Sequence, residues 1–546
     1  MPDAPVPSST GEKTPTLFLK KGTAKPLHGG HPWVFADAIA RSENAPKSGD
    51  EVRVIDDRGS VLGRGFYSPD SAIAVRLLSR ADIPIGDALI ESRIDEALRL
   101  RREILKLGVA DASYVSSAPA AAPAAAPVPS PEDLLSPSDQ QKVADLDAQL
   151  AKIQLFAAQY GMDAMEETSE LRLRRDAILK GAGIKPKASE PSASDSEKFG
   201  KTIGASTAFP GKASESSRGA AAPTADSTLS SPPLHKGGLG GVTPDAPTTA
   251  YRLINSEGDG LGGLTVDVYG NYLAVQIGTA GMDRRRELIL DVLEKKLKPK
   301  AILDRSDARS RQIEKLDPPQ IGPLRGTAPD APHAVWEHGV KMICDLRAGK
   351  SQKTGLYLDQ RENRARFASL AAGRDVLDVF SYSGGFALHA ARAGARSITL
   401  LESSEEALEL AKTNLEQNHI DDGDLVNAEW SEGFKHLREN GKQFDLIVLD
   451  PPKFARSREN VGEAVSAYRD LNAQAVRLLA PGGLLFTCSC SGNVSETDFE
   501  RAVAAGIRSA GRRAVLLERR GASPDHPVPP GFDQGRYLKC LVLQVV

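Results

Sequence analysis

The sequence predicts an α/β fold, with a doubly wound, mostly parallel sheet in the C-terminal part of the chain. From residue 346 onward, apolar runs of strand length alternate with helical stretches, the pattern of parallel βαβ units. The run at 375–380 leads through two glycines into a helical pattern, and the run at 398–402 ends in an acid. Ligands of such sheets bind at the carboxyl ends of the strands, so we expect the functional site at that edge.

Composition limits the class of protein. The chain has 546 residues, enough for three or four domains, and 69 basic against 72 acidic residues give a net charge of −3. A nucleic-acid partner would therefore have to be bound by local basic patches. The polar start of the chain and the lack of long apolar runs predict a soluble, cytoplasmic protein without membrane contact. Four cysteines favour neither disulfides nor a zinc site, and no metal is expected.

The N-terminal part predicts a small β domain. Residues 1–15 are expected to be a disordered tail, and residues 16–80 contain short strand candidates at 17–19, 51–55, 61–67 and 72–78. His31 lies beside Trp33 and Phe35 on a predicted loop, and the two aromatic side chains are expected in the core. Residues 81–115 follow as a connector, with a charged amphipathic helix from 85 to 107.

A compositional change separates this region from the rest of the chain. Residues 116–249 are rich in Ala, Pro, Ser and Gly and can bury little, so a low-complexity, mostly disordered insert is predicted. Apolar spacing within 140–180 favours a helical hairpin or a partner-binding helix. No function of the insert follows from the sequence.

Residues 250–345 predict a middle α+β module. Two strands meet at the turn 269–271, a helix covers 283–297, and strands follow near 301–303 and 340–344. Its arginines are more typical of a solvated face than of a nucleic-acid groove.

The glycine turn in the C-terminal part predicts a nucleoside-binding site. Gly384 and Gly385 allow a ligand to approach the backbone, and the following helix directs its first N–H groups toward it. The spacing differs from that of the dinucleotide fingerprint. About twenty residues later, Glu402 can accept hydrogen bonds from both ribose hydroxyls of a nucleoside.

Two further strand ends carry candidate catalytic residues. The run at 444–449 leads into Asp450-Pro-Pro-Lys-Phe454, in which the prolines stiffen the loop that follows the acid. The run at 483–488 ends in Cys488-Ser-Cys490. Cys488 should still be packed within the strand, whereas Cys490 lies past its end, where a thiolate could reach a substrate.

Together these motifs resemble the class I S-adenosylmethionine-dependent methyltransferases, and more narrowly the RlmI-type rRNA large-subunit cytosine-5 methyltransferases. The matching segments cover residues 16–107 and 250–546, and they are His31–Phe35, Glu257–Leu264, Asp304–Asp307, Lys353–Arg361, Asp378–Phe386, Asp450–Phe454 and Ser489–Gly492. Two features depart from the pattern: the 116–249 insert, and Glu432 where an aspartate is usual. Lys453 stands where some RNA cytosine-5 enzymes have an additional cysteine, so one cysteine must do the covalent work.

The resemblance implies an N-terminal PUA-like RNA-binding barrel at 16–80, the α+β module at 250–345, and a Rossmann-like methyltransferase domain with a mostly parallel seven-stranded sheet at 346–546. S-adenosylmethionine is the implied cofactor, and RNA, in particular rRNA, is the implied partner; a homodimer is left open. The implied cofactor-binding residues are Gln360, Arg361, Asp378, Ser381, Tyr382, Ser383, Gly384, Gly385, Glu402, Glu432 and Asp450. The RNA-contact candidates are His31, Trp33, Lys353, Pro451, Pro452 and Lys453.

The expected reaction is formation of 5-methylcytosine. Carbon C5 of cytosine is a poor nucleophile until a thiolate adds at C6 while a carboxyl group engages N3. Cys490 is the expected nucleophile and Asp450 the N3 partner. Two alternatives remain open: an RNA N-methyltransferase that uses the Asp-Pro-Pro loop without a cysteine, and a noncatalytic RNA-binding protein that relies on its PUA-like domain.

Overall fold

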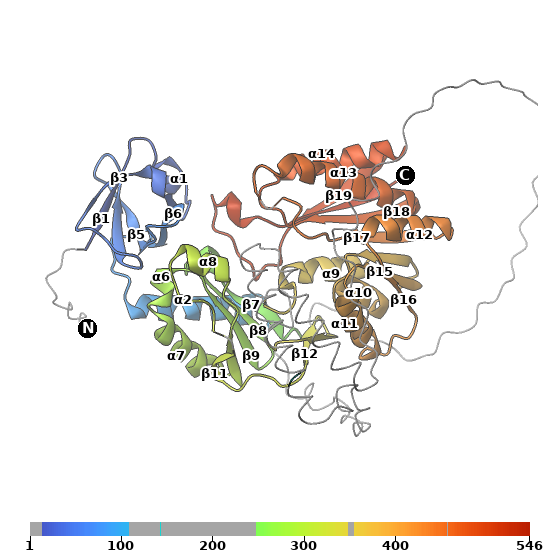
Figure 1. Ribbon diagram of the computed structural model, residues 1–546, viewed down its shortest axis with the longest axis horizontal. Coiled ribbons are helices and arrows are strands. Elements are labelled where there is room, and N and C mark those ends of the chain that lie inside the picture. The colour runs from blue at the N-terminus through green and yellow to red at the C-terminus, as the bar shows by residue number, and fades with distance from the viewer. Residues whose placement is uncertain (1–13, 109–141, 143–246, 321, 348–353, 456) are drawn as a thin grey trace, which may run out of the picture. The chain divides into compact units, whose positions relative to one another are not determined.

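The structure, a computed structural model, describes residues 14–108, 142, 247–320, 322–347, 354–455 and 457–546. These residues form four β-sheets that follow one another along the chain (Figure 1). Residues 1–13 of the expected tail lie outside the described residues. So does nearly all of the 116–249 insert, including the helical hairpin expected at 140–180 apart from residue 142.

The N-terminal sheet has six strands in the order β2-β6-β5-β4-β1-β3. Its core contains Leu17, Val52, Val54 and Val75, which are all fully buried. The elements are β1 (Thr16–Leu19), α1 (Lys25–His28), β2 (Trp33–Phe35), η1 (Ala36–Ala38), β3 (Ile39–Glu43), β4 (Glu51–Ile55), β5 (Val61–Tyr67) and β6 (Ile73–Ser79).

Strand β2 corrects two expectations about the first aromatic motif. Trp33 and Phe35 lie on a strand rather than on a loop, and the strand pairs with β6. Neither side chain is in the core: Trp33 is half-buried and Phe35 is 38% exposed. Val34 between them is buried, and because successive side chains of a strand point to opposite faces, its two neighbours must face away from the core.

A helix connects this sheet to the middle module. Helix α2 (Asp87–Arg99) continues into the π-helical turn η2 (Leu100–Ile104). Its buried residues Ile90 and Ile94 belong to the same hydrophobic cluster as Leu253 and Ile254 of the middle sheet. The connector is therefore packed along its length and is part of the core of the module that follows.

The middle module is a five-stranded sheet in the order β11-β10-β9-β8-β7, followed by the separate hairpin β12-β13. Three strands, β7, β11 and β12, were not among the expected ones. Strands β11 and β12 are short and partly buried, and their sequences have no strong apolar pattern from which a strand could be predicted. The elements are β7 (Ala250–Asn255), η4 (Ser256–Asp259), β8 (Leu264–Tyr269), β9 (Tyr272–Ile277), α6 (Ala280–Asp283), α7 (Arg286–Leu297), β10 (Ala301–Asp304), α8 (Ala308–Ile313), β11 (Pro323–Gly326), β12 (His333–Glu337) and β13 (Val340–Cys344).

The C-terminal sheet confirms the predicted doubly wound fold. It has seven strands in the order β16-β15-β14-β17-β18-β20-β19, all parallel except β20, which runs antiparallel to both of its neighbours. The strands are β14 (Asp375–Val379), β15 (Ser397–Glu402), β16 (Gly423–Asn427), β17 (Phe444–Leu449), β18 (Leu479–Ser489), β19 (Ala514–Arg520) and β20 (Lys539–Val545). The helices are η5 (Leu358–Gln360), α9 (Arg361–Ala368), α10 (Gly385–Arg392), α11 (Glu405–Glu416), α12 (Trp430–Glu439), α13 (Val461–Arg477), α14 (Glu496–Ser509) and η6 (Asp533–Gly535).

The strand order of this sheet determines where a ligand can bind. Strand β14 lies between β15 and β17, so the chain order reverses beside β14. The backbone N–H of Asp450, just after β17, donates to the carbonyl of Val379 at the end of β14 (3.3 Å). The loops that follow β14 and β17 therefore start side by side, at the switch point where open α/β sheets bind their ligands.

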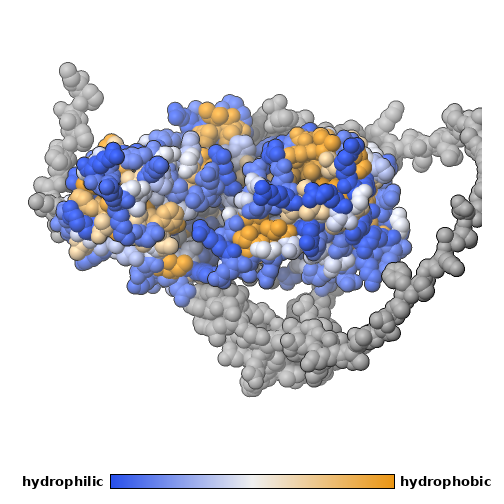
Figure 2. All heavy atoms as spheres, turned by 90° about the horizontal axis from the view of Figure 1, so that it is seen from above, coloured by the Kyte–Doolittle hydropathy of each residue, from blue (hydrophilic) through white to orange (hydrophobic). Residues whose placement is uncertain are grey.

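The face shown in Figure 2 is largely hydrophilic over the described residues, with hydrophobic residues in separate patches. Among the helices that the structure describes, none combines the length and the hydropathy that a membrane span requires.

Candidate active site

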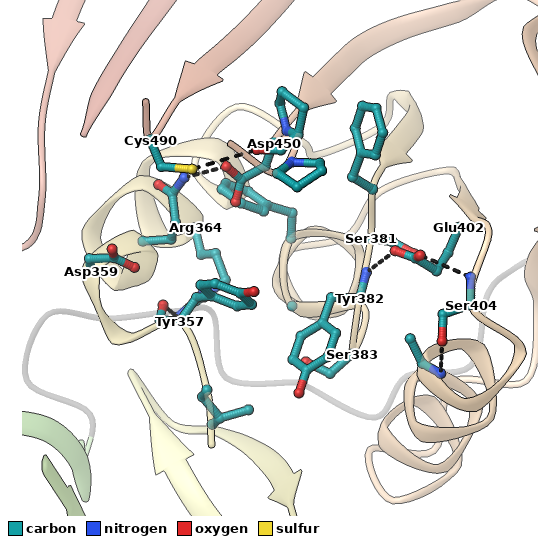
Figure 3. A pocket seen from close by; sticks show the side chains of 18 of the residues that line it. Tyr357, Asp359, Arg364, Ser381, Tyr382, Ser383, Glu402, Ser404, Asp450 and Cys490 are labelled. Atoms are coloured by element: carbon teal, nitrogen blue, oxygen red, sulfur yellow. Dashed lines mark hydrogen bonds between the residues drawn. The ribbon is translucent and has the colours of Figure 1, made fainter. Parts of the chain in front are cut away.

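A cavity of about 610 Å³ lies at the carboxyl ends of β14, β15, β17 and β18 (Figure 3). Its walls come from the η5 segment, the loop after β14, the end of β15 and the Asp450 loop. The lining residues are Met342, Leu356, Tyr357, Asp359, Gln360, Arg364, Phe380, Ser381, Tyr382, Ser383, Gly385, Phe386, Glu402, Ser403, Ser404, Ala407, Glu429, Asp450, Pro451, Pro452, Lys453, Cys490 and Leu538.

The loop after β14 has an unusual backbone. Phe380 and Tyr382 have positive φ angles of 61° and 48°, a region that bulky residues rarely adopt. Gly384 follows with φ 75°, and a Cβ atom there would lie 2.9 Å from the side chain of Leu400. Helix α10 then begins at Gly385. Backbone strain of this kind is found at ligand sites, where the surrounding fold holds the loop in place.

Asp378 is a fully buried acid beneath this loop. Its Oδ2 accepts a hydrogen bond from the backbone N–H of Ala387 (3.0 Å). Burial raises the pKa of Asp378 to about 7, and the negative charges of Asp450 and Glu402 act in the same direction. Among the described residues, Asp378 Oδ1 and the hydroxyl of Ser381 have no hydrogen-bond partner. Of the two residues only Ser381 lines the cavity, so a ligand that brought a hydrogen-bond donor to this loop would satisfy its hydroxyl.

Glu402 connects the end of β15 to the same loop. Its carboxylate accepts from the backbone N–H groups of Tyr382 (2.9 Å), Ser403 (3.0 Å) and Ser404 (3.0 Å). Figure 3 shows Glu402 beside Ser381 and Tyr382, with Ser404 at the start of α11. The acid thus fixes the glycine loop and also lines the cavity.

The acid of the Asp-Pro-Pro loop is held from the opposite side. Gln360 Nε2 donates to Asp450 Oδ1 (2.9 Å), and Gln360 Oε1 accepts in turn from Asn363 Nδ2 (2.6 Å). Gln360 is buried at the end of η5, so its amide has a fixed orientation. These two hydrogen bonds set the position of the Asp450 carboxylate at the cavity wall.

Cys490 lies at the same wall, just past the end of β18. Its side chain is half-buried, and Sγ lies 3.8 Å from the carbonyl oxygen of Pro451 (Figure 3). Cys488, two residues earlier, is fully buried in the sheet opposite Cys540 of β20. The hydrogen bond to Cys540, burial and neighbouring negative charge raise the pKa of Cys488 well above its ordinary value. Only Cys490 of this pair reaches the cavity.

Some residues proposed from the sequence lie elsewhere. Arg361 is buried away from the cavity lining, where its Nη1 pairs with Asp525 (2.7 Å). Glu432 is exposed on α12, and Glu429, at the start of that helix, lines the cavity instead. Lys353 lies outside the described residues.

Trp33 belongs to β2 of the N-terminal sheet, His31 precedes that strand, and neither residue lines the cavity. His31 Nε2 lies 3.2 Å from Gln534 Oε1, and the ring centroid of Trp33 lies 4.7 Å from that of Phe532. Both partners are in the segment that links β19 to β20.

Two further lining residues, Tyr357 and Arg364, were not among the site residues predicted from the sequence. Tyr357 forms an edge-to-face pair with the predicted Tyr382, with ring centroids 5.4 Å apart. Arg364 makes two hydrogen bonds to Glu337 (2.6 and 2.7 Å), an interaction that lowers the pKa of Glu337 to about 2 despite burial. The unusual Leu-Tyr-Leu-Asp-Gln-Arg motif before α9 was the available signal, but its partners come from distant parts of the chain.

Two family models match the chain. The model of a PUA-like domain matches residues 17–80, and that of S-adenosylmethionine-dependent methyltransferases matches residues 323–543. A ribosomal RNA large subunit methyltransferase I of Shewanella amazonensis is 43% identical over 300 residues, which are 54% of this chain and 75% of the relative. The chain belongs to the ribosomal RNA large subunit methyltransferase I family. A member from Klebsiella pneumoniae is 29% identical over 538 residues, 97% of this chain and 98% of that relative.

Solved structures show the same fold as this methyltransferase. A Streptococcus mutans protein described as an S-adenosylmethionine-dependent methyltransferase aligns with a TM-score of 0.61 at 17% identity, covering 97% of this chain and 99% of its own. A second methyltransferase structure, solved in complex with SAH, aligns with a TM-score of 0.62 at 18% identity and the same coverage. The resemblance that the sequence suggested is thus confirmed for family, fold and cofactor dependence.

The cavity of this S-adenosylmethionine-dependent enzyme fits its cofactor in chemical terms. The cofactor carries an ammonium group, ribose hydroxyls and an adenine ring. The cavity offers the Ser381 hydroxyl, the Glu402 carboxylate and a wall of aromatic side chains, and the sequence-predicted Asp378 lies fully buried beneath the same loop and does not line the cavity. Among the described residues, no group of three or more His, Cys, Asp or Glu side chains is arranged to hold a metal ion.

Proposed function

We propose that this methyltransferase forms 5-methylcytosine in the RNA of the large ribosomal subunit, acting in the cytoplasm. The observation that carries the proposal is the placement of Cys490 and Asp450 on one wall of the cavity. Cys490 Sγ is 3.8 Å from the carbonyl oxygen of Pro451, the residue that follows Asp450. The relatives named as large-subunit rRNA methyltransferases support the RNA class.

The proposed cofactor contacts divide among three parts of the cavity. Ser381, which lines the cavity, would accept from the amino group of the methionine moiety, and Asp378, buried beneath the same loop, would add negative charge on that side. Glu402 would accept from the ribose hydroxyls, since its carboxylate lines the cavity beside Tyr382. Glu429 at the start of α12 replaces Glu432 as the candidate for the adenine end. When bound, S-adenosylmethionine supplies an electrophilic methyl group.

The protein's own part in the chemistry falls to two residues. The Cys490 thiolate forms a bond from Sγ to C6 of cytosine, the electrons of the C5–C6 double bond move toward N3, and N3 takes a proton from the Asp450 carboxyl group, which recovers that proton when C5 is methylated. Carbon C5 then has the electron density to accept the methyl group. Loss of the C5 proton to a base allows the C6–S bond to break, which restores the aromatic ring and the free thiolate. Gln360 keeps the Asp450 carboxylate oriented through this cycle.

RNA access requires an unstacked cytosine, because the target carbon is covered in a helix. Lys453, Pro451 and Pro452 lie at the cavity wall and are the proposed neighbours of the extruded nucleotide. Lys353 is proposed to contact phosphate, and the PUA-like domain with His31 and Trp33 is proposed to bind RNA beyond the cavity.

Paired cysteine variants test this function. Cys490→Ala should abolish methyl transfer to rRNA, by at least about a thousandfold, and leave S-adenosylmethionine affinity within about twofold, because the thiol acts only in chemistry. Cys488→Ala, the matched control, removes a buried thiol outside the cavity, so it should retain activity and lose about 1 kcal/mol of stability.

A trapping experiment adds a direct readout. RNA that contains 5-fluorocytidine should form a covalent adduct with the wild type and with Cys488→Ala, because fluorine at C5 cannot leave as a proton. Cys490→Ala should form none. An adduct with Cys490→Ala would exclude Cys490 as the nucleophile. Methylation of an exocyclic amine, detected by nucleoside mass spectrometry, would favour the N-methyltransferase alternative.

A further inference from the structure

Lys539 is a buried lysine next to the turn that carries Cys490. It is the first residue of β20 and pairs across the sheet with Ser489, the last residue of β18. Only 7% of its surface is exposed. Its Nζ donates to the carbonyl oxygens of Ser491 and Val494, each at 2.8 Å. The side chain thus crosses the turn that follows β18 and holds it from the sheet side.

The charge of Lys539 has little compensation in its surroundings. Both hydrogen bonds go to backbone carbonyls, and within the part of the chain that the structure describes no carboxylate lies within ion-pair distance of Nζ. Burial lowers the pKa of Lys539 from its ordinary value, while negative charge on Cys490 and on Glu496 opposes that shift. Burying a cation without an anionic partner is costly unless a nearby group becomes negative.

The other titratable groups around Cys490 do not provide such a cation. Asp450 is an acid and supplies no positive charge in either protonation state. Tyr357 and Tyr468 both interact with Cys490, and burial raises the pKa of each, that of Tyr468 to about 12, so both rings stay neutral. Lys453 also lines the cavity, but it is exposed to solvent. Lys539 is therefore the buried positive charge that faces this turn.

We propose that Lys539 is a positioning residue that holds the 489–494 turn and favours the thiolate form of Cys490. The inference rests on the proposed role of Cys490 as nucleophile and adds how the thiol is activated. The proton of the thiol passes to solvent, and the ammonium group keeps its own protons. Lys539 touches neither the substrate nor the cofactor in this role. Its effect reaches the reaction through the charge and position of Cys490.

Alkylation of Cys490 provides a test that requires neither RNA nor cofactor. Iodoacetamide reacts with the thiolate, so the rate of Cys490 modification across pH 6–10, followed by peptide mass spectrometry, reports the ionisation of this one residue. In Lys539→Met the rate at pH 7 should fall roughly tenfold and the midpoint should move to higher pH, because a nearby positive charge is removed. Lys539→Arg, which keeps the charge, should stay close to the wild type. Lys412→Met on the exposed face of α11 should change nothing.

The outcomes separate this inference from a purely structural role. An unchanged pH profile in Lys539→Met would overturn the proposal, even if the variant is less stable. If Lys539→Met does not fold, Lys539→Gln takes its place as the uncharged variant, because it keeps a hydrogen-bond donor. Its alkylation profile is then compared with that of Lys539→Arg. A shifted alkylation profile together with no 5-fluorocytidine adduct in the wild type would support the role of Lys539 and reject the proposed function. A 5-fluorocytidine adduct in the wild type together with an unshifted alkylation profile in Lys539→Met would support the proposed function and reject the role of Lys539.

Discussion

The carboxyl group of Asp378 shows how one residue can couple the stability of this methyltransferase to its ligand. The group is fully buried, and its Oδ1 has no partner among the described residues. Its pKa of about 7 lies above the ordinary value, so the folded protein holds this proton more tightly than the unfolded chain does. The resulting stabilisation is complete below the ordinary pKa of aspartate and is lost as the pH rises through about 7.

Asp378→Asn should therefore stabilise the cofactor-free protein at high pH. The variant mimics the protonated acid, so its free energy of unfolding should gain roughly 2–4 kcal/mol on the wild type between about pH 4 and pH 8. Urea unfolding at a series of pH values measures the difference. If the free energies of unfolding of the wild type and the variant changed with pH in the same way over this range, Asp378 would not titrate there.

Glu402 has a double task, since it fixes the glycine loop and is proposed to bind ribose. Glu402→Ala should weaken S-adenosylmethionine binding by roughly 1–3 kcal/mol, because the ribose hydroxyls and three backbone N–H groups lose their acceptor. Isothermal titration measures the change. Glu406→Ala is the control. It removes an exposed acid from the first turn of α11, the helix that follows β15, and should bind the cofactor as the wild type does. Equal affinities of the two variants would remove Glu402 from the cofactor site.

At the scale of elements, the segment between β19 and β20 connects separate parts of the fold through one acid. Asp525 is fully buried and accepts from the backbone N–H of Arg252 (2.9 Å) and from Arg361 Nη1 (2.7 Å). Its backbone carbonyl accepts from Arg101 Nη2 (2.8 Å). These contacts overcome burial and hold the pKa of Asp525 well below its usual range, with Arg361 and His526 as the main charged partners. The start of α9 at Arg361, which directly follows Gln360 of η5, is anchored in this way.

Asp525→Ala should cost about 3–5 kcal/mol of unfolding free energy, because it removes the buried acceptor of Arg361 Nη1 and leaves Glu362 as the remaining acid paired with Arg361. Denaturant unfolding monitored by circular dichroism gives the value. Asp533→Ala, in an exposed position of the same segment, should stay within about 0.5 kcal/mol of the wild type. Similar losses in both variants would mean that the segment as a whole, and not the buried acid, is sensitive to substitution.

These elements also show where sequence reasoning succeeds and where it stops. The strands around Asp378, Glu402 and Asp450 are predictable because each is a short apolar run that ends in a polar residue at one edge of the sheet. The role of Arg361 is not predictable, because its partner Asp525 lies 164 residues away. Glu429 was missed because β16 ends at Asn427 and α12 starts at Trp430, which leaves Glu429 at the strand end and turns Glu432 outward.

At the scale of the whole molecule, the described residues on either side of 109–246 contact each other at Gly108 and Thr248. The backbone N–H of Gly108 donates to the carbonyl of Thr248 (2.9 Å), and Gly108 lies close to Tyr251. The two points at which residues 109–246 are attached to the described chain therefore lie next to each other. The entropic cost of closing a loop between two such points grows only slowly with its length, about 0.6 kcal/mol for each doubling.

Replacing residues 110–246 by four glycine or serine residues should thus leave a folded, active enzyme. A linker of this size spans the distance between hydrogen-bonded residues with ease. The unfolding transition should stay cooperative, with an equal or slightly higher midpoint in calorimetry, and methyl transfer to rRNA should persist. Loss of cooperative unfolding in the shortened protein would show that the removed residues contribute to the folded core.

The Gly108–Thr248 hydrogen bond also implies that continuity of the chain at this point is not needed once the protein has folded. On one side of it, α2 contributes Ile90 and Ile94 to the middle core, and Arg101 pairs with Asp259 across the junction. A protease cut within 110–246 should therefore yield two fragments that stay together without a covalent link. The enzyme could be produced as two separately expressed polypeptides, and the return of methyl-transfer activity on mixing would serve as a reporter of their association.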